Sequence, residues 1–294
     1  MLRIQRVSRS FGPLTALDQI SFDVNPGRLT GFVGANGAGK TTAMRIVMGV
    51  LTADAGAVHW QGEEPDLAVR RRFGYMPEER GLYPKMTVRD QIVYFARLHG
   101  TGAADAGRRT GELLDRLGLA DRADDRLETL SLGNQQRAQL AAALVHDPVL
   151  LLLDEPFSGL DPVAVDTTAE LLRERAAAGV PVLFSSHQLG VVESLCDDLV
   201  VLDGGRVRAA GAAEQLRQAH AGARFRLRLG EDAGWLRDEP ELEVLDVDGS
   251  RALVQLPDVD QDQKLLHRLL ERGAVHEFSR VLPTLAEIFR EVVR

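Results

Sequence analysis

The stretch "GFVGANGAGKTT", Gly31 to Thr42, decides the fold of this chain, because it combines spaced glycines with a lysine and two threonines. Residues 34–41 fit the pattern G-x-x-x-x-G-K-[ST], a loop whose backbone N–H groups surround the phosphates of a nucleotide. Glycine loses more backbone freedom on folding than any other residue, so clustered glycines indicate that the backbone approaches something closely. The sequence therefore favours a phosphate-binding loop over an ordinary glycine-rich turn.

The residues on both sides of this loop agree with that prediction. The run Leu29 to Val33 is mostly apolar and is typical of a buried strand. From Lys40 to Met48, apolar side chains recur with helical spacing at Met44, Val47 and Met48. The loop would therefore open onto a helix N-terminus, where free N–H groups and the helix dipole favour an anion.

Composition limits the kind of protein this can be. The 294 residues are 45% hydrophobic and 27% charged, which indicates a folded chain of one large or two modest domains. The formal charge of −8 argues against a protein that spreads along nucleic acid, so we expect no nucleic-acid partner. Cys196 is the only cysteine, which excludes an intramolecular disulfide and fits a reducing compartment.

No segment of the sequence looks like a signal peptide or a membrane span. The opening residues "MLRIQRVSRS" lack an apolar h-region, and unbroken apolar runs such as Val149 to Leu153 are only a few residues long. A spanning helix needs about 20 apolar residues. We expect a soluble cytoplasmic chain whose role at a membrane, if it has one, comes through a partner.

The predicted elements up to about Gly211 alternate between strands and helices. Half-exposed strands open the chain ("LRIQRV", "LDQISFDV"), and further short strands are predicted at Ala57 to Gly62, Phe73 to Met76, Val149 to Leu153, Val180 to Phe184 and Leu199 to Leu202. Helical periods run from Thr87 to Leu98, where Thr87 and Asp90 form a capping box, and from Gly111 to Leu117. Strands alternating with helices predict a parallel sheet covered on both faces.

Beyond about Gly211 the pattern changes. Alternating strands "RFRLRLG", "ELEVLDV" and "RALVQL" are followed by the amphipathic helix "DQKLLHRLLERG", the strand "AVHEFSRV" and a closing helix "PTLAEIFREVV" with Pro283 in its first turn. If Asp232 to Arg237 forms a short helix, the order is β-α-β-β-α-β with a terminal helix. This predicts a separate small α+β domain.

A second motif narrows the chemistry. "VLLLLDEP" reads as a buried strand that ends in Asp154 and Glu155, beside the phosphate loop. Asp154 and the Thr41 hydroxyl would hold Mg²⁺, while Glu155 would face the attacking water. The helix that follows "TLSLG" has a serine and a glycine at its start and could bind a second phosphate, although alone it would be an ordinary capped helix.

Four elements now stand in order: "GANGAGKTT", "SLGNQQR", "LLLLDEPFSGLDP" and "LFSSHQL". Together they closely resemble the nucleotide-binding cassette of ABC transporters, over about Leu2 to Gly211. The resemblance implies an α/β P-loop NTPase (RecA-like) cassette with an antiparallel β subdomain and a helical subdomain. We place the cassette at residues 1–215, with the helical subdomain at about 87–148, and a ferredoxin-like α+β accessory domain at 222–294.

The resemblance also assigns roles to individual residues. Lys40, Glu155 and His187 would be catalytic, with His187 as the switch histidine at the γ-phosphate, and Thr41, Asp154 and Glu78 would be near Mg²⁺. Ser131 to Asn134 correspond to the signature that contacts ATP held by a second subunit, and Asp161 would lie at the subunit junction. The residues expected to bind ATP are Phe11 (stacking on adenine), Gly34, Asn36, Gly37, Ala38, Gly39, Lys40, Thr41, Thr42, Glu78, Ser131, Gly133, Asn134 and Asp161.

Three departures from the family pattern stand out. Ala35 replaces a proline in the phosphate loop. Leu132 and Asn134 replace a glycine and the glutamine of the signature LSGGQ, while Ser131 and Gly133 remain. Glu78 stands where the family has the Q-loop glutamine, which adds a negative charge near the triphosphate.

The stretch "YMPEERGLYPKM" and the C-terminal module resemble the ATPase subunits of ABC-2-type exporters. The implied partners are a separate membrane permease and a second ABC subunit, in a head-to-tail dimer at the inner face of the cell membrane. Three alternatives stay open: an importer ATPase, a soluble ABC protein acting on ribosomes or DNA, and a nucleotide-gated scaffold without turnover. Glu79 to Met86 would dock a short helix of the permease.

Overall fold

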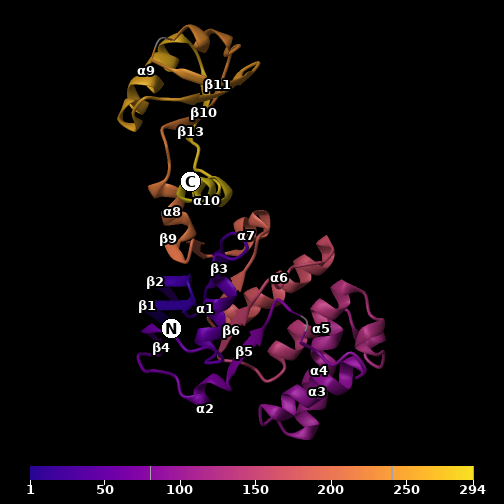
Figure 1. Cartoon of the computed structure of the whole chain (residues 1–294). Coiled ribbons are helices and arrows are strands. Elements are labelled where there is room, and N and C mark those ends of the chain that lie inside the picture. Colours follow the sequence, from indigo (N-terminus) through magenta and orange to yellow (C-terminus); the bar gives the residue numbers. More distant parts are fainter. Residues whose placement is uncertain (80, 240, 294) are drawn as a thin grey trace. The chain divides into compact units, whose positions relative to one another are not determined.

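The computed structural model describes residues 1–79, 81–239 and 241–293 (Figure 1). It divides into two compact units, the first comprising Met1–Ala213 and the second Glu214–Val292, with Val293 grouped with the first. The sequence placed the end of the cassette at residue 215. Each unit is described by itself.

A six-stranded sheet forms the centre of the first unit, in the order β5-β6-β7-β3-β8-β9. The first five of these strands run parallel, and β9 pairs with β8 in the antiparallel direction. Every residue of β3, β6 and β7 is buried, as expected for strands covered on both faces. The strands are β3 (Leu29–Val33), β5 (Phe73–Met76), β6 (Leu150–Leu153), β7 (Val182–Ser185), β8 (Asp198–Asp203) and β9 (Arg206–Ala212).

A three-stranded antiparallel sheet of order β2-β1-β4 packs against this core. It comprises β1 (Leu2–Phe11), β2 (Leu14–Val24) and β4 (Ala55–Trp60), with Leu2 opposite both Val24 and Trp60. Its buried side chains share one hydrophobic cluster with β3 and the first helix, and the rings of Phe22 and Phe32 lie 5.2 Å apart. The antiparallel β subdomain therefore fixes the strand that precedes the phosphate loop.

Three helices gather at one end of this unit in Figure 1: α3 (Val88–Leu98), α4 (Ala103–Arg116) and α5 (Leu132–Leu144). The Thr87 side chain accepts a hydrogen bond from Asp90 N, so the predicted cap is present. α4 begins eight residues before the predicted Gly111, because its buried face includes the small Ala106 and the polar Thr110. The remaining helices are α1 (Lys40–Val47), α2 (Leu67–Arg70), α6 (Pro162–Ala177) and α7 (Leu189–Leu195), with 3-10 turns at Ala120–Arg122 and Leu127–Thr129.

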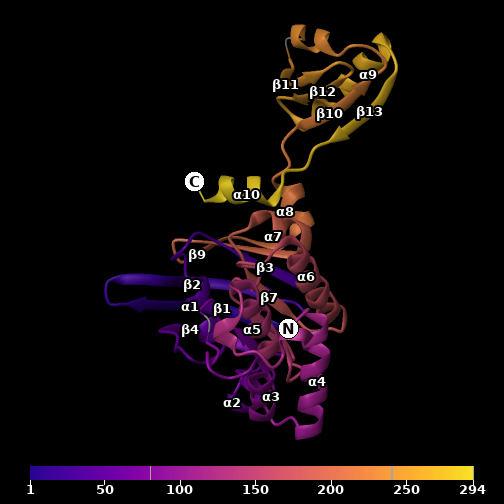
Figure 2. The same cartoon turned by 90° about the vertical axis from the view of Figure 1, so that its right-hand side faces the viewer.

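The second unit contains a four-stranded antiparallel sheet of order β11-β12-β10-β13 (Figure 2). Its strands are β10 (Arg224–Leu229), β11 (Glu243–Asp248), β12 (Arg251–Gln255) and β13 (Val275–Arg280), and α9 (Asp262–Arg272) joins the last two. This is the ferredoxin-like order, with a 3-10 helix at Gly234–Asp238 in place of the first α-helix. The other elements are a 3-10 turn at Val259–Gln261, α8 (Ala213–Ala219) and α10 (Leu285–Val292).

The closing helix starts later than predicted. Pro283 precedes α10 instead of lying in its first turn. The Thr284 hydroxyl accepts from Glu287 N, and the Glu287 carboxylate accepts from Thr284 N at 2.8 Å. This reciprocal capping box sets the helix start. In the part of the chain that the structure describes, no helix is long and apolar enough to cross a membrane.

Candidate functional site

The glycines of the phosphate loop are required by its geometry. Gly37 and Gly39 have left-handed φ angles of +80° and +109°. A Cβ on Gly39 would lie 2.6 Å from the Ala16 carbonyl oxygen, and one on Gly34 would lie 2.3 Å from the Leu202 carbonyl oxygen. The loop therefore wraps tightly against β2 and β8, where a residue with a Cβ would not fit.

Lys40 is held across this loop. Its ammonium group donates to the carbonyl oxygens of Gly34 at 2.7 Å and Ala35 at 3.2 Å, and the residue is 8% exposed. An ammonium has three hydrogens, so one remains for a phosphate oxygen. Ala35 takes part through its backbone alone, which explains why it can replace the proline of the family pattern.

Asp154 links the loop to the end of β6. It is 1% exposed, and it accepts hydrogen bonds from the hydroxyls of Thr41 and Ser185, both at 2.6 Å. The Thr41 oxygen keeps its lone pairs when its hydrogen points at the carboxylate. Hard oxygen donors of this kind suit Mg²⁺, so Thr41 and Asp154 fit the ion that the resemblance implies. Burial, with Asp154 nearby, raises the pKa of Tyr75 on the adjacent β5.

Glu155 lies one residue further on, in an unusual backbone conformation. Its φ is +53°, in the left-handed region, and it is 7% exposed. Its N–H donates to Ser185 Oγ at 2.8 Å, and its carbonyl oxygen accepts from Gln136 Nε2 at 2.8 Å. His187 Nδ1 lies 2.8 Å from the Glu155 carboxylate, which accepts, so Nδ1 carries the hydrogen. The predicted base and the predicted switch histidine are thus paired.

A cavity of about 460 Å³ is lined by Lys40, Thr41, Asp154 and Glu155, while Gly34 and His187 are not among its lining residues. This size is typical of ligand pockets. Phe11 is 46% exposed at its rim, with the Arg9 guanidinium 5.0 Å above the ring centroid. The lining comprises Phe11, Leu14, Ala16, Asn36, Gly37, Ala38, Gly39, Lys40, Thr41, Thr42, Glu78, Asp154 and Glu155.

The predicted residues of the signature and of the subunit junction do not line this cavity, and they lie at two helix starts. The Ser131 hydroxyl caps α5 by accepting from Asn134 N, and the Asp161 carboxylate caps α6 by accepting from Ala164 N at 2.9 Å. Asn134 accepts from the Arg137 guanidinium of its own helix. A Cβ on Gly133 would lie 2.9 Å from the Gly159 carbonyl oxygen, so the signature needs glycine there for close packing.

Sequence reasoning missed Ser185 and Gln136. Both are buried and bond the Asp154–Glu155 segment from other elements. Ser185 precedes the switch histidine by two residues and Gln136 follows the signature, so both lay inside quoted motifs, yet their partners are distant in sequence.

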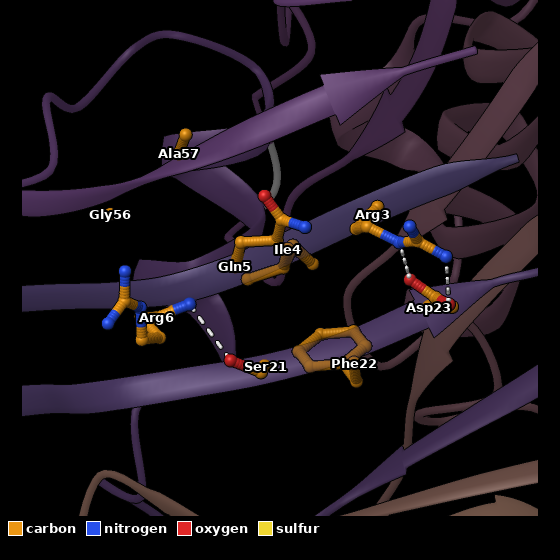
Figure 3. A pocket seen from close by; sticks show the side chains of 9 residues that line it. All are labelled: Arg3, Ile4, Gln5, Arg6, Ser21, Phe22, Asp23, Gly56 and Ala57. Carbon is orange, nitrogen blue, oxygen red and sulfur yellow. Dashed lines mark hydrogen bonds and ion pairs between the residues drawn. The ribbon is translucent and has the colours of Figure 1, made fainter. Parts of the chain in front are cut away.

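A larger hollow of about 570 Å³ lies over the antiparallel sheet (Figure 3), and it shares no lining residue with the cavity at the phosphate loop. Arg3 and Asp23 form an ion pair at 2.8 Å there, and Arg6 N donates to Ser21 Oγ at 2.8 Å. None of the predicted site residues lines it. Volume alone therefore does not identify the functional site.

Comparison with known proteins identifies the family. Residues 17–158 match the family model described as "ABC transporter", and residues 211–293 match "ATP-binding protein DrrA1-3-like, C-terminal domain". The uncharacterized ABC transporter ATP-binding protein YhaQ of Bacillus subtilis (strain 168) is 36% identical, over 100% of this chain and 98% of the relative. The chain belongs to the ATP-binding subunits of ABC transporters. As a member of this family, it is an ATPase.

Two further comparisons place this ABC subunit among its relatives. The Nod factor export ATP-binding protein I of Paraburkholderia xenovorans (strain LB400) is 36% identical, over 95% of this chain and 92% of that protein. A solved structure described as an ATP-binding subunit of an ABC transporter is 32% identical, with a TM-score of 0.69, and covers 74% of this chain and 92% of its own. The predicted fold class and family are confirmed.

Proposed function

We propose that this ABC subunit powers export through a separate membrane permease, by closing head to tail on a second ABC subunit when ATP binds. Hydrolysis then reopens the pair. The observation that carries the catalytic part is that Lys40, the Thr41–Asp154 pair and Glu155 line one cavity, and that His187 bonds the Glu155 carboxylate.

Each residue has a role that its surroundings support. Lys40 neutralises β- and γ-phosphate oxygens from inside the loop, and Thr41 and Asp154 hold Mg²⁺. Mg²⁺, when bound, neutralises charge that develops on the phosphates. The Glu155 carboxylate orients or deprotonates the attacking water, while His187 reports the γ-phosphate. Glu78 and Phe11 line the same cavity, where Glu78 would lie near Mg²⁺ and Phe11 would stack on the adenine.

Two substitutions test these roles by separating binding from turnover. Glu155→Gln keeps the shape of the side chain but removes its charge, so the variant should bind ATP with Mg²⁺ and lose most phosphate release. Lys40→Ala should weaken ATP binding itself. Glu112→Gln, at an exposed carboxylate on α4, is the matched control and should behave as the parent. Parental turnover by Glu155→Gln would transfer the role of base to Glu78 or His187.

The second half of each ATP site comes from the partner copy. Ser131 and Gly133 at the start of α5, and Asp161 at the start of α6, lie outside the cavity of their own chain. A helix N-terminus attracts anions, so the α5 N-terminus can close on a γ-phosphate held by a second subunit. The Asn134 side chain is engaged by Arg137 and its backbone N–H by the Ser131 hydroxyl, so Ser131 and Gly133 are the residues proposed to reach that phosphate.

The permease docks on an aromatic cluster at the start of the helical subdomain, formed by Tyr83, which precedes α3, and by Tyr94 and Phe95 of α3. The ring of Tyr83 lies 6.2 Å from that of Tyr94 and 6.3 Å from that of Phe95, and Tyr83 is 50% exposed. Exposed aromatic clusters of this kind are typical of protein interfaces. Within the predicted docking segment, residue 80 lies outside the described residues.

If the permease docks on this cluster, substitutions in it should weaken binding of the permease without changing the affinity for ATP. Leu82 of the predicted docking segment is buried, so the test uses the exposed rings: Tyr83→Ala with Tyr94→Ala should reduce recovery of the permease from membranes while ATP binding stays at the parental value. Unchanged recovery of the permease would contradict this docking site.

Export is favoured over import by the relatives and by the C-terminal unit. The family model matched at residues 211–293 is described as the C-terminal domain of a DrrA1-3-like ATP-binding protein, the module that resembles ABC-2-type exporters in the sequence, and the relative named above is a Nod factor export ATP-binding protein. The subunit would then lie in the cytoplasm, peripheral on the inner face of the membrane. Stimulation of its ATPase by a co-purified permease and its exported compound would support export; stimulation only with a binding protein and an imported solute would favour the importer.

A further inference from the structure

The backbone of Glu155 is held in a conformation that glutamate does not favour. A left-handed φ costs a residue with a Cβ about 1–2 kcal/mol. Neighbouring groups must therefore maintain it, and two of them bond its backbone: Ser185 accepts from the N–H, and Gln136 donates to the carbonyl oxygen, each at 2.8 Å. Together they fix the peptide groups on both sides of the Cα.

Gln136 differs from Ser185 because it belongs to the helical subdomain. It lies in α5, 4% exposed, one turn after the signature residues. Gln139, three residues on and also 4% exposed, donates to the carbonyl oxygens of Pro77 at 2.6 Å and Glu79 at 3.2 Å. One face of α5 thus holds both the segment of Glu155 and the segment of Glu78 through buried glutamine amides.

We infer that Gln136 is a positioning residue that keeps Glu155 in its left-handed conformation and makes the alignment of the catalytic carboxylate depend on the place of α5. This inference rests on the proposed role of Glu155. The N-terminus of α5 is proposed to meet ATP held by the partner. If α5 shifts on making that contact, the hydrogen bond from Gln136 to the Glu155 carbonyl oxygen moves the Glu155 backbone with it. The chain then aligns its own base when its signature is engaged.

The test replaces the amide while preserving side-chain length. Gln136→Met cannot donate, so kcat should fall about tenfold, the rate equivalent of one hydrogen bond, while KM for ATP changes by less than about twofold. Gln135→Met is the matched control: Gln135 donates to Leu127 and Leu130 carbonyls instead, and its loss should leave kcat within about twofold of the parent.

A second variant separates positioning from loss of packing. In Gln136→Glu, the carboxylate cannot donate to the Glu155 carbonyl oxygen, but the protonated carboxylic acid can. The ratio of its kcat to that of the parent should therefore rise as pH falls, whereas the same ratio for Gln136→Met should stay flat. Parental kcat in Gln136→Met, or a flat ratio for Gln136→Glu, would overturn the inference. Parental turnover in Glu155→Gln would instead overturn the proposed catalytic role of Glu155, on which this inference rests.

Discussion

Ser185→Ala should destabilise the cassette more than substitution of an exposed serine, because the Ser185 hydroxyl bonds two buried groups, the Asp154 carboxylate and the Glu155 backbone N–H. It donates to Asp154 at 2.6 Å and accepts from Glu155 N at 2.8 Å, and the residue is fully buried. A hydrogen bond to a charged group contributes about 1.5–3 kcal/mol, and a buried N–H left unpaired costs about 1–3 kcal/mol. Since Asp154 keeps its bond from Thr41, we expect a loss of about 3 kcal/mol.

Thermal unfolding of the parent and the variant measures this loss. For a unit of this size, 1 kcal/mol shifts Tm by about 2–4 °C, so Ser185→Ala should lower Tm by roughly 10 °C. Ser194→Ala is the control, because its hydroxyl is exposed and donates to Val191 of its own helix. It should change Tm by less than about 2 °C. A shift for Ser185→Ala no larger than that of the control would refute the assignment of Ser185 as the support of Asp154 and Glu155.

Two other predictions concern pH and the C-terminal unit. Burial, followed by repulsion from the stacked His99, lowers the pKa of His146 from 6.5 to about 4. The unfolded chain therefore binds this proton more readily than the folded cassette does. The contribution of His146 to the free energy of unfolding should be fully present above pH 6.5 and fall by about 3 kcal/mol as pH drops toward 4. Urea unfolding at a series of pH values measures this loss, which His146→Gln should not show. A chain truncated after Ala213 should still bind ATP, because the described cavity is lined only by residues up to Glu155; loss of binding in a truncation that keeps its circular dichroism would contradict this.

Much of the site could be predicted because its chemistry is local in sequence. The phosphate loop is one continuous pattern, and Asp154 was recognisable as the carboxylate after an apolar strand. Ser185 and Gln136 could not be found in this way, because they bond Glu155 across separations of 30 and 19 residues. Every residue has a backbone N–H and a carbonyl oxygen, so a side chain that bonds the backbone cannot be recognised from the type of its partner.

The fold shows the same division. Strongly apolar strands such as Leu150–Leu153 were predicted within a residue, and the Thr87 cap was recognised from its own motif. The first half of α4 was missed, since its buried positions include Ala106 and Thr110, which carry little apolar signal. Tertiary packing of small side chains, invisible in a single sequence, supplies that helix.

The central claim is that each ATP site is completed by the α5 N-terminus of a second copy, and size-exclusion chromatography of Glu155→Gln tests it most directly. With ATP and Mg²⁺ the variant should elute as a dimer, and without ATP it should lose the ATP-dependent part of that dimer. Adding Ser131→Arg to Glu155→Gln should leave ATP bound to each chain but abolish the ATP-dependent dimer, because the bulky side chain stands at the exposed start of α5. A dimer that persists in the double variant, or one that never depends on ATP in Glu155→Gln, would contradict the shared site.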